Sequence, residues 1–365
     1  MRKGDRKLCV VLPSHWAKNF GGAEGQVRYL LDALIERCGF EIAYLARYVD
    51  TTFDPAGYKI NKIKRLPGFG HYGFVFDAPA LLFLLNRIRP DVIYQRVGCA
   101  YTGISAYYAK KNKCKLVWHV SIDSDVSPAM NIFKGPFRYF EKRVMEYGIR
   151  EATSIIAQTH TQAEKLEKNY GRSSARVIYN FHPFPEEKII KTTGVKVVWI
   201  ANLKPNKQPE IFLNLANELK NKTEAEFIMI GRCDRNGIYG SFLRGVEATG
   251  AVDYLGERSQ EEVNKILSSA EILVNTSLEE GFSNTFIQAW MRQVPVVSLN
   301  VDPDGLLEKN RIGYCSGTYQ KLRDNVLELI ENDLVRKEMG MRAQKYAFEK
   351  HSLSNIEDVI RILEQ

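Results

Sequence analysis

The chain has 365 residues, of which 45% are hydrophobic, so it is long enough for two domain cores. Its longest apolar run, residues 78–85, is far shorter than the ~20-residue helix that crosses a bilayer. No signal-peptide core follows the basic residues at its start, and its six cysteines are widely spaced without a C-x-x-C pair, so we expect a cytoplasmic protein with reduced thiols and no structural zinc site. The net charge of +8 is unevenly distributed, because residues 1–190 contain 29 Lys and Arg against 18 Asp and Glu (+11), whereas the remainder contains 22 against 25 (−3).

Predicted strands alternate with predicted helices along the first half of the chain. The apolar run at 8–12 predicts a buried strand, and a loop through Gly21 and Gly22 leads into a helix that ends near Arg37. Such alternation predicts a parallel, doubly wound sheet covered by helices on both faces. Further strands are expected at 41–45, 91–95, 115–120, 154–157 and 176–179.

The same pattern starts again after a linker that Pro183 and Pro185 stiffen. A helix is expected at 353–365, with a stripe of apolar side chains along one face. We therefore expect two Rossmann-like α/β domains, an N-terminal domain at 1–184 and a C-terminal domain at 185–345, followed by a C-terminal helical segment at 346–365. Strands of the second domain are expected at 196–200, 225–230, 252–255, 272–276 and 295–299.

Several polar residues follow predicted strands, where open α/β sheets bind their ligands. His119 ends the strand at 115–120, and a structural hydrogen bond is the alternative to a role in a site. His15 and His160 also follow strands. Lys207 lies just beyond the first strand of the second half, although a loop lysine is usually solvated. In Gly21-Gly22-Ala23-Glu24 the glycine pair either forms a simple tight turn or brings a helix N-terminus close to an anion.

The most informative segment runs from Glu280 to Trp290, between two predicted strands. A helix is predicted at 285–291, and amides at a helix start lack internal partners and lie at the positive end of its dipole. Gly281 lets a ligand approach the backbone closely. Residues 281–285 therefore predict a turn that binds a diphosphate, with Glu280 beside it.

This segment resembles the E-x7-E signature of family-4 retaining glycosyltransferases, with Glu280 as the first acid. Gln288 stands where the second acid is expected, and its amide oxygen can accept a ribose hydroxyl bond without the charge. The resemblance implies the GT-B fold, in which two Rossmann-like domains face each other across a cleft and the C-terminal helix returns to the first domain. It also implies metal-independent, retaining transfer from a nucleotide-diphosphate sugar.

The resemblance also assigns individual residues. The loop at 21–24 matches the G-G-x-E loop of the family near the donor diphosphate, and 199–209 resembles its G-R-L-x-x-x-K-G loop, with Lys207 at the lysine. Asn202 stands where the arginine is expected, so Lys204 or Arg232 is expected to supply the second cation. The expected catalytic residues are His119, Lys207 and Glu280. The expected donor-binding residues are Gly22, Asn202, Lys204, Arg232, Gly281, Phe282, Ser283, Asn284, Thr285 and Gln288. The expected acceptor-side residues are His15, Glu24, Asp123, Asp125 and His160.

Two segments, Asp123-Ser124-Asp125 and Asp302-Pro303-Asp304, spell the D-x-D metal signature of the other large glycosyltransferase fold. We reject this interpretation, because short acidic motifs arise by chance and neither one belongs to a single N-terminal nucleotide-binding domain. No metal and no cofactor are expected. The aspartates at 123 and 125 are expected to contact acceptor hydroxyls instead.

The basic first half predicts an anionic partner. No nucleic-acid-binding motif is present, so we favour the inner membrane surface or a lipid-linked acceptor of a cell-envelope polysaccharide such as lipopolysaccharide. The basic run at 59–65 is followed by aromatic residues through Phe76. That mixture suits an interfacial membrane contact, and the alternative is an ordinary loop that packs its aromatics inward.

Three other functions compete with a glycosyltransferase. A nucleotide-sugar epimerase of the same fold would need no acceptor. An NAD-dependent dehydrogenase is disfavoured because Pro13-Ser14-His15-Trp16 follows the first strand in place of a G-x-G-x-x-G turn. A basic nucleic-acid-binding protein would show strongly salt-dependent binding.

Overall fold

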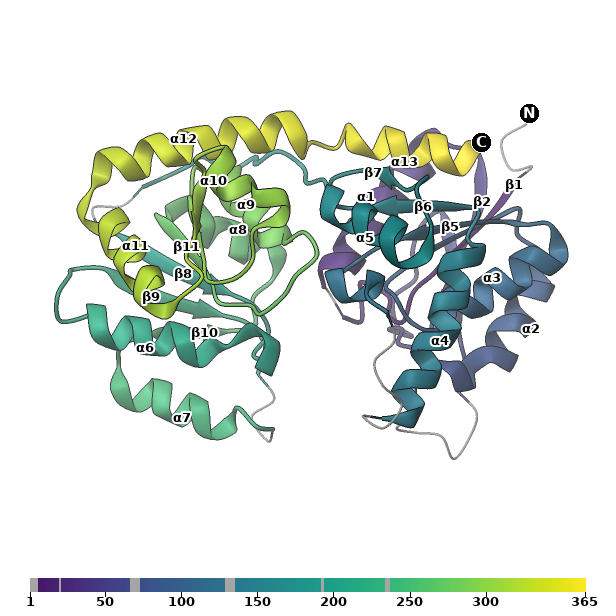
Figure 1. Cartoon of the computed structure of the whole chain (residues 1–365), viewed down its shortest axis with the longest axis horizontal. Coiled ribbons are helices and arrows are strands. Elements are labelled where there is room, and N and C mark those ends of the chain that lie inside the picture. The colour runs from purple at the N-terminus through teal and green to yellow at the C-terminus, as the bar shows by residue number, and fades with distance from the viewer. Residues whose placement is uncertain (1–5, 20, 66–72, 129–134, 192–193, 234–236) are drawn as a thin grey trace. The chain divides into compact units, whose positions relative to one another are not determined.

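The computed structural model describes residues 6–19, 21–65, 73–128, 135–191, 194–233 and 237–365 (Figure 1). The chain divides into two compact units. Unit 1 consists of Met1–Phe181 together with Leu353–Gln365, and unit 2 consists of His182–Ser352. The division therefore falls between 181 and 182, next to the proline-rich linker.

Unit 1 is built on a seven-stranded parallel sheet with the order β3-β2-β1-β4-β5-β6-β7. After β1 the chain adds β2 and β3 on one side and then β4 to β7 on the other, so the order reverses between β1 and β4. The strands are β1 (Arg6–Val11), β2 (Phe40–Ala46), β3 (Tyr58–Lys62), β4 (Val92–Arg96), β5 (Lys115–His119), β6 (Ser154–Ala157) and β7 (Arg176–Val177). The helices are α1 (Gly22–Arg37), η1 (Phe74–Asp77), α2 (Ala78–Ile88), α3 (Ala100–Asn112), η2 (Asp123–Val126), α4 (Pro136–Glu151), α5 (His160–Tyr170) and α13 (Asn355–Glu364).

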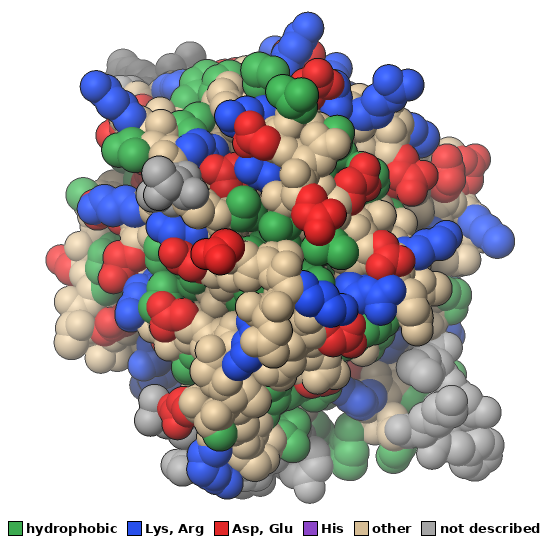
Figure 2. Space-filling model, turned by 90° about the vertical axis from the view of Figure 1, so that its left-hand side faces the viewer, with side chains coloured by type: hydrophobic (Ala, Val, Ile, Leu, Met, Phe, Trp, Pro, Cys, Tyr) green, Lys and Arg blue, Asp and Glu red, His purple; other side chains and the backbone are tan. Residues whose placement is uncertain are grey.

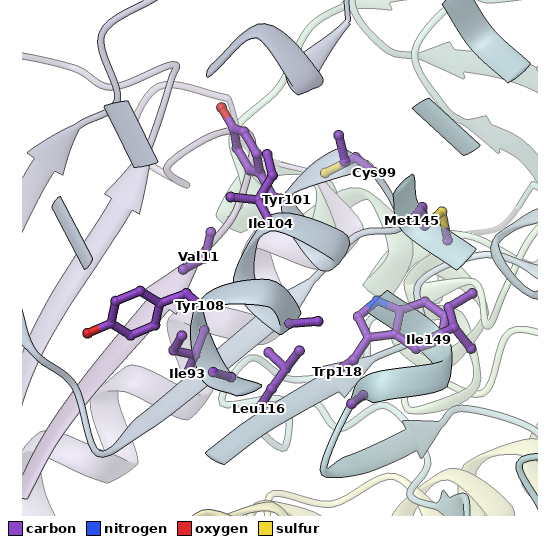
Figure 3. Close-up of a cluster of buried hydrophobic side chains, with 14 of the residues drawn as sticks. Val11, Ile93, Cys99, Tyr101, Ile104, Tyr108, Leu116, Trp118, Met145 and Ile149 are labelled. Atoms are coloured by element: carbon purple, nitrogen blue, oxygen red, sulfur yellow. The ribbon is translucent and has the colours of Figure 1, made fainter. Parts of the chain in front are cut away.

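The strands of unit 1 are apolar on both faces because each face has a core of its own. Successive side chains of a strand point to opposite faces. Accordingly, Cys9 and Val11 of β1 belong to one buried cluster, and Leu8 and Val10 belong to another. Figure 3 shows the first cluster, in which Trp118 lies among side chains of the neighbouring elements.

The second cluster of unit 1 includes the C-terminal helix. Ile356, Val359, Ile360 and Leu363, the apolar stripe expected from the sequence, are buried together with Leu34 of α1. The C-terminal helix thus returns to the first domain, as the fold prediction expected. The preceding helix, α12 (Asp333–Lys350), belongs to unit 2, so the return begins at residue 353.

Unit 2 has a six-stranded parallel sheet with the order β10-β9-β8-β11-β12-β13, which reverses between β8 and β11. Its strands are β8 (Lys196–Ile200), β9 (Glu226–Ile230), β10 (Asp253–Gly256), β11 (Ile272–Asn275), β12 (Val296–Ser298) and β13 (Gly313–Cys315). Its helices are η4 (Pro205–Lys207), α6 (Pro209–Leu219), α7 (Gly240–Thr249), α8 (Gln260–Ser269), α9 (Asn284–Trp290), η5 (Pro303–Gly305), α10 (Leu306–Lys309), α11 (Tyr319–Glu331) and α12.

Two parallel sheets confirm the doubly wound prediction, but two strands were missed. β13 has only three residues. β3 is the edge strand that pairs with β2, and its exposed lysines hide the apolar pattern of a strand. The interpretation of residues 59–65 as a loop is therefore wrong for the part that lies in β3.

The aromatic residues that follow the basic run differ in their surroundings. Phe74 packs inward, with its ring 5.1 Å from the Tyr101 ring and the Arg47 guanidinium 4.1 Å above it. The aromatic residues at 69, 71 and 72 lie outside the described residues. Across the described part of the chain, no helix is long and apolar enough to span a bilayer. On the face drawn in Figure 2, positive and negative side chains are interspersed, so the basic excess of the chain does not gather there.

Candidate functional site

The loops that follow β8 and β11 meet at the switch point of the second sheet. Lys207, at the end of η4, donates from Nζ to Oε1 of Glu280 and forms an ion pair with it. Ser277 Oγ donates to the same carboxylate oxygen over 2.9 Å. The side chains of Lys207 and Glu280 are 18% and 17% exposed, so the pair is largely enclosed and still reachable by a ligand.

Backbone contacts fix the position of Lys207. Thr276 Oγ1 donates to the Lys207 carbonyl over 2.6 Å, and the same hydroxyl accepts a hydrogen bond of 2.9 Å from Trp199 Nε1. The backbone amide of Leu278 donates to the Asn206 carbonyl over 2.8 Å. The two loops are thereby joined, and the cation and the carboxylate are set side by side before any ligand arrives.

The loop after β9 lies beside the loop after β8. Asn202 Oδ1 accepts from the Arg232 amide over 3.2 Å, so Asn202, in place of the family arginine, serves here as a backbone partner. A Cβ at Gly231, which has φ of +154°, would lie 1.7 Å from the Ala201 carbonyl oxygen, so only glycine fits this crossing. Lys204 and Arg232 are both exposed, and the structure does not favour either as the second cation.

The turn after Glu280 leads directly into α9, with Ser283 as the N-cap residue. Gly281, Phe282 and Ser283 are buried, and Ser283 Oγ lies 2.8 Å from Thr285 Oγ1. Asn284 and Thr285 are half-buried. The first amides of α9 therefore lie in the same short segment as Glu280, as the motif predicted, while the Phe282 ring packs inward.

Gln288 is more enclosed than its expected role suggests. It is 4% exposed, and its Nε2 donates to Oδ1 of Asn264 on α8 over 3.2 Å. The side-chain amide of Gln288 is thereby oriented by α8. Its role as a ribose partner stays a prediction, in which Oε1 accepts the hydrogen bond from the ribose hydroxyl.

In unit 1, His119 is the last residue of β5 and is 1% exposed. Its Nδ1 lies 2.8 Å from the Tyr94 hydroxyl and 3.5 Å from Nη1 of Arg96. Burial, aided by the positive charge of Arg96, holds the pKa of His119 well below its usual range. Its Nε2 is buried without a hydrogen-bond partner among the described residues. The imidazole is therefore neutral, with one ring nitrogen still to be satisfied.

A network of buried polar side chains surrounds His119. Arg96 Nη2 donates to Asn180 Oδ1 over 2.8 Å, and Asn180 Nδ2 donates to Gln158 Oε1 over 3.2 Å. These residues follow or end neighbouring strands from β4 to β7. The sequence interpretation missed Tyr94, Arg96, Gln158 and Asn180. A signal was present, because Tyr94-Gln95-Arg96 places three polar residues at the carboxyl end of an otherwise apolar strand.

The glycine pair introduces α1, which begins at Gly22 with Gly21 as its N-cap residue. A Cβ at Gly21 would lie 2.6 Å from Oε2 of Glu24, so the acid lies close to the turn that precedes the helix. Gln26 fixes the first turn of α1 through two hydrogen bonds to the backbone of Phe181, of 2.7 and 3.0 Å.

The two other candidate histidines have different surroundings. His15 is fully buried, with its Nδ1 accepting from the Ala17 amide over 3.1 Å and its Nε2 lying 2.8 Å from the Tyr58 hydroxyl. Burial lowers the pKa of His15 to about 4. His160 is exposed at the start of α5, with its ring 6.3 Å from that of Tyr179. His15 thus uses both ring nitrogens within the protein.

Asp123, Asp125 and Asp302 of the D-x-D segments form hydrogen bonds or ion pairs with other residues of the chain. Asp123 forms an ion pair of 2.7 Å with Lys165 and accepts from Gln162 Nε2 over 3.0 Å. Asp125 is buried and accepts from three backbone amides, those of Gly98, Ser121 and Ile122 at 3.3, 3.0 and 3.1 Å, while burial raises its pKa. Asp302 accepts from the Leu307 amide over 2.9 Å. In the described ranges, no group of three or more His, Cys, Asp or Glu residues is arranged to hold a metal ion.

Sequence comparisons identify the class of protein that this fold and site define. Residues 20–182 match the family described as Glycosyltransferase Family 4, and residues 194–332 match the family described as Glycosyl transferases group 1. Together the two matches span most of both units. The chain belongs to the family-4 glycosyltransferases, and its two parallel-sheet α/β units are those of the GT-B fold.

Particular relatives share the fold at low sequence identity. The crystal structure of HepE from Anabaena in complex with UDP and glucose has a TM-score of 0.77 and 17% identity, covering 98% of each chain. WaaG, described as a glycosyltransferase involved in lipopolysaccharide biosynthesis, has a TM-score of 0.79 and 12% identity, covering 98% of this chain and 99% of its own.

One curated relative adds an activity to the comparison. The poly(ribitol-phosphate) alpha-N-acetylglucosaminyltransferase of Staphylococcus aureus is 24% identical over 241 residues, or 61% of this chain. The match covers only 45% of that enzyme, so the chain aligns with less than half of its length.

Proposed function

We propose that the protein transfers a sugar, with retention of anomeric configuration, from a nucleotide-diphosphate sugar to a hydroxyl of a lipid-linked cell-surface glycan. The observation that carries this proposal is the Lys207–Glu280 pair at the switch point of the second sheet. A cation, a carboxylate and the first amides of α9 occur together there, which are the groups that a sugar diphosphate needs. The HepE structure with UDP and glucose supports uridine nucleotides as the first donors to test.

The proposed reaction replaces one bond at the anomeric carbon with another. The bond from that carbon to the diphosphate breaks, the acceptor oxygen bonds on the same face, and the acceptor proton passes to the leaving phosphate. Lys207 and the amides at 281–285 stabilise the negative charge that develops on the diphosphate. Glu280 accepts hydrogen bonds from hydroxyls of the donor sugar. No protein nucleophile and no metal ion take part.

The acceptor is proposed to bind to unit 1, where the sequence carries its positive excess. Residues 1–190 have a net charge of +11, which favours an anionic acceptor or an anionic membrane surface. The curated relative supports such an acceptor, because its name specifies transfer to poly(ribitol-phosphate), a polymer that carries phosphate. We propose that the protein acts in the cytoplasm at the inner face of the membrane.

The test is a transfer assay with purified full-length protein, a panel of UDP-, GDP- and ADP-sugars, and lipid-linked glycans from a cell envelope. The proposal expects release of nucleoside diphosphate that depends on the acceptor, persists in EDTA and is lost in Glu280→Gln. NMR of the product gives its anomeric configuration, which must equal that of the donor. Interconversion of free nucleotide sugars without an acceptor would indicate an epimerase, and loss of transfer in EDTA with rescue by Mg²⁺ would contradict the metal-free mechanism.

A further inference from the structure

The hydrogen-bond partners of His119 determine which of its ring nitrogens carries the hydrogen. β4 and β5 pair in parallel with Arg96 opposite His119, which brings Tyr94 and Arg96 to the Nδ1 side of the ring. Tyr94, Arg96 and His119 are all at most 1% exposed. Water therefore has little access to these groups, and the protein itself sets their hydrogen bonds.

The chemistry of arginine gives the direction of these bonds. A guanidinium group only donates hydrogen bonds, because it has five N–H groups and no acceptor. Nη1 of Arg96 lies 3.5 Å from Nδ1 of His119 and can only donate, so this ring nitrogen is an acceptor. The Tyr94 hydroxyl, 2.8 Å from the same nitrogen, therefore donates to it. An Nδ1–H group would instead face the N–H groups of Arg96 at 3.5 Å, donor against donor.

We infer that Tyr94 and Arg96 lock His119 in the neutral tautomer that carries its hydrogen on Nε2, so that His119 is a permanent hydrogen-bond donor toward its ligand. The Nε2 atom is buried and has no partner among the described residues, as expected of a donor held ready for an acceptor oxygen. Arg96 is held in turn by Asn180. Tyr94 and Arg96 are therefore positioning residues that act through His119.

This tautomer limits what His119 does chemically. Its Nδ1 lone pair is engaged by Tyr94, and its Nε2 has no lone pair to accept a proton, so the ring is not a general base. Because burial, together with the neighbouring charge of Arg96, lowers the pKa of the ring and opposes protonation, His119 is not an acid either. The ligand atom that fits Nε2–H is an acceptor oxygen, and identifying it with a substrate sugar hydroxyl rests on the proposed function.

The inference is tested by NMR of the full-length protein labelled with ¹⁵N at histidine only. The chain has six histidines, so the spectrum is simple, and His119→Asn identifies the signals of His119. In the wild type at pH 7 we expect a deprotonated, downfield Nδ1 and a protonated Nε2, with no titration of this ring from pH 5 to 8. A hydrogen on Nδ1, or an imidazolium at pH 7, would overturn the inference.

Two variants and a control separate the lock from general effects on folding. Tyr94→Phe removes the hydroxyl, and we expect the two nitrogen signals of His119 to move toward each other as the tautomers mix. Arg96→Gln removes the guanidinium donors from the Nδ1 side, and because the ring stays buried we expect it to remain neutral while its two nitrogen signals move toward each other. The control is Tyr108→Phe, because Tyr108 is also buried and donates to the Leu85 carbonyl over 3.0 Å. Signals that respond equally to the control, or that do not respond to Tyr94→Phe, would refute the lock.

Ligand titration then separates the inference from the proposed function. If His119 contacts a sugar hydroxyl, Tyr94→Phe weakens binding of UDP-glucose by up to about tenfold and leaves binding of UDP unchanged. If the wild-type tautomer is as expected but no nucleotide sugar binds, the lock stands and the proposed function fails. If nucleotide sugars bind but the tautomer differs, the lock fails alone.

Discussion

Replacing Lys207 with methionine isolates the contribution of the cation at the second sheet. Methionine keeps most of the length of the side chain and removes the charge that we propose for the diphosphate. We expect this variant to fold, because Ser277 still donates to Glu280 and the backbone carbonyl of residue 207 still accepts from Thr276. We therefore expect a cooperative thermal melt close to that of the wild type, with nucleotide binding as the property that changes.

The expected loss follows from the environment of the lysine. Its side chain is 18% exposed, so a diphosphate bound there is only partly screened by solvent. A hydrogen bond to a charged group contributes about 1.5–3 kcal/mol. At about 1.4 kcal/mol per factor of ten, the Kd for UDP should rise roughly 10- to 150-fold. The turnover number for transfer should fall as well, because the charge on the diphosphate grows as the bond breaks.

Isothermal titration of UDP, GDP and ADP into Lys207→Met and the wild type measures this loss. The control is Lys220→Met, since Lys220 is in the same unit and donates only to the Thr249 carbonyl at the surface. That variant should bind nucleotide as the wild type does. Equal affinity of Lys207→Met and the wild type for their best nucleotide would remove Lys207 from the site and with it the basis of the donor assignment.

Three further predictions concern other parts of the molecule. Gln288→Leu should weaken binding of free nucleotide by about 1–3 kcal/mol while Gln288→Glu retains it, and equal calorimetric affinity of wild type and both variants would refute a ribose contact. Burial lowers the folded-state pKa of His15 and of His182 to about 4, below the unfolded value of 6.5. Between pH 6.5 and pH 4 the unfolded chain therefore binds more protons than the folded chain. The free energy of unfolding should fall as the pH drops through this range. Each histidine contributes up to about 3 kcal/mol that is fully present above pH 6.5, and His182→Gln should flatten the pH dependence of urea unfolding, whereas an unchanged slope would contradict the assignment. The protein should sediment with anionic vesicles at low salt and be released by added salt, with about 1 kcal/mol lost per lysine removed from the basic run at 59–65; no sedimentation of the wild type would contradict peripheral membrane binding. The lysines to replace with serine are Lys59, Lys62 and Lys64.

The parts of the fold that the sequence predicted are those in which one local pattern decides the structure. Continuous apolar runs such as 8–12 and 196–200 indicated strands buried on both faces, and the stripe of α13 indicated a helix with one apolar face. β3 was missed because it is an edge strand in which Lys59 and Lys62 are exposed and the other three residues are only half-buried. Its structure depends on pairing with β2, which the residues at 58–62 do not reveal by themselves.

The residues of the candidate site likewise fall into those that a local motif predicts and those that depend on the fold. Lys207 and Glu280 are 73 positions apart, and their motifs predicted that each would follow a strand of the second sheet, where the structure brings them into contact. The Tyr94–Arg96–His119 cluster depends on the register between β4 and β5 and on the burial of all three side chains. Neither property can be derived from residue types along the chain, so the sequence identified His119 as a candidate and left its partners unrecognised.

Hydrogen exchange of the full-length protein with and without a saturating nucleoside diphosphate tests most directly whether the switch point of the second sheet binds the donor. The ligand is whichever of UDP, GDP and ADP raises the melting temperature most. We predict slower amide exchange in 201–207 and 276–286, with no change in α7 or α11 of the same unit. Protection confined to other segments, or no protection by any of the three nucleotides, would contradict the assignment of the donor site to Lys207 and Glu280.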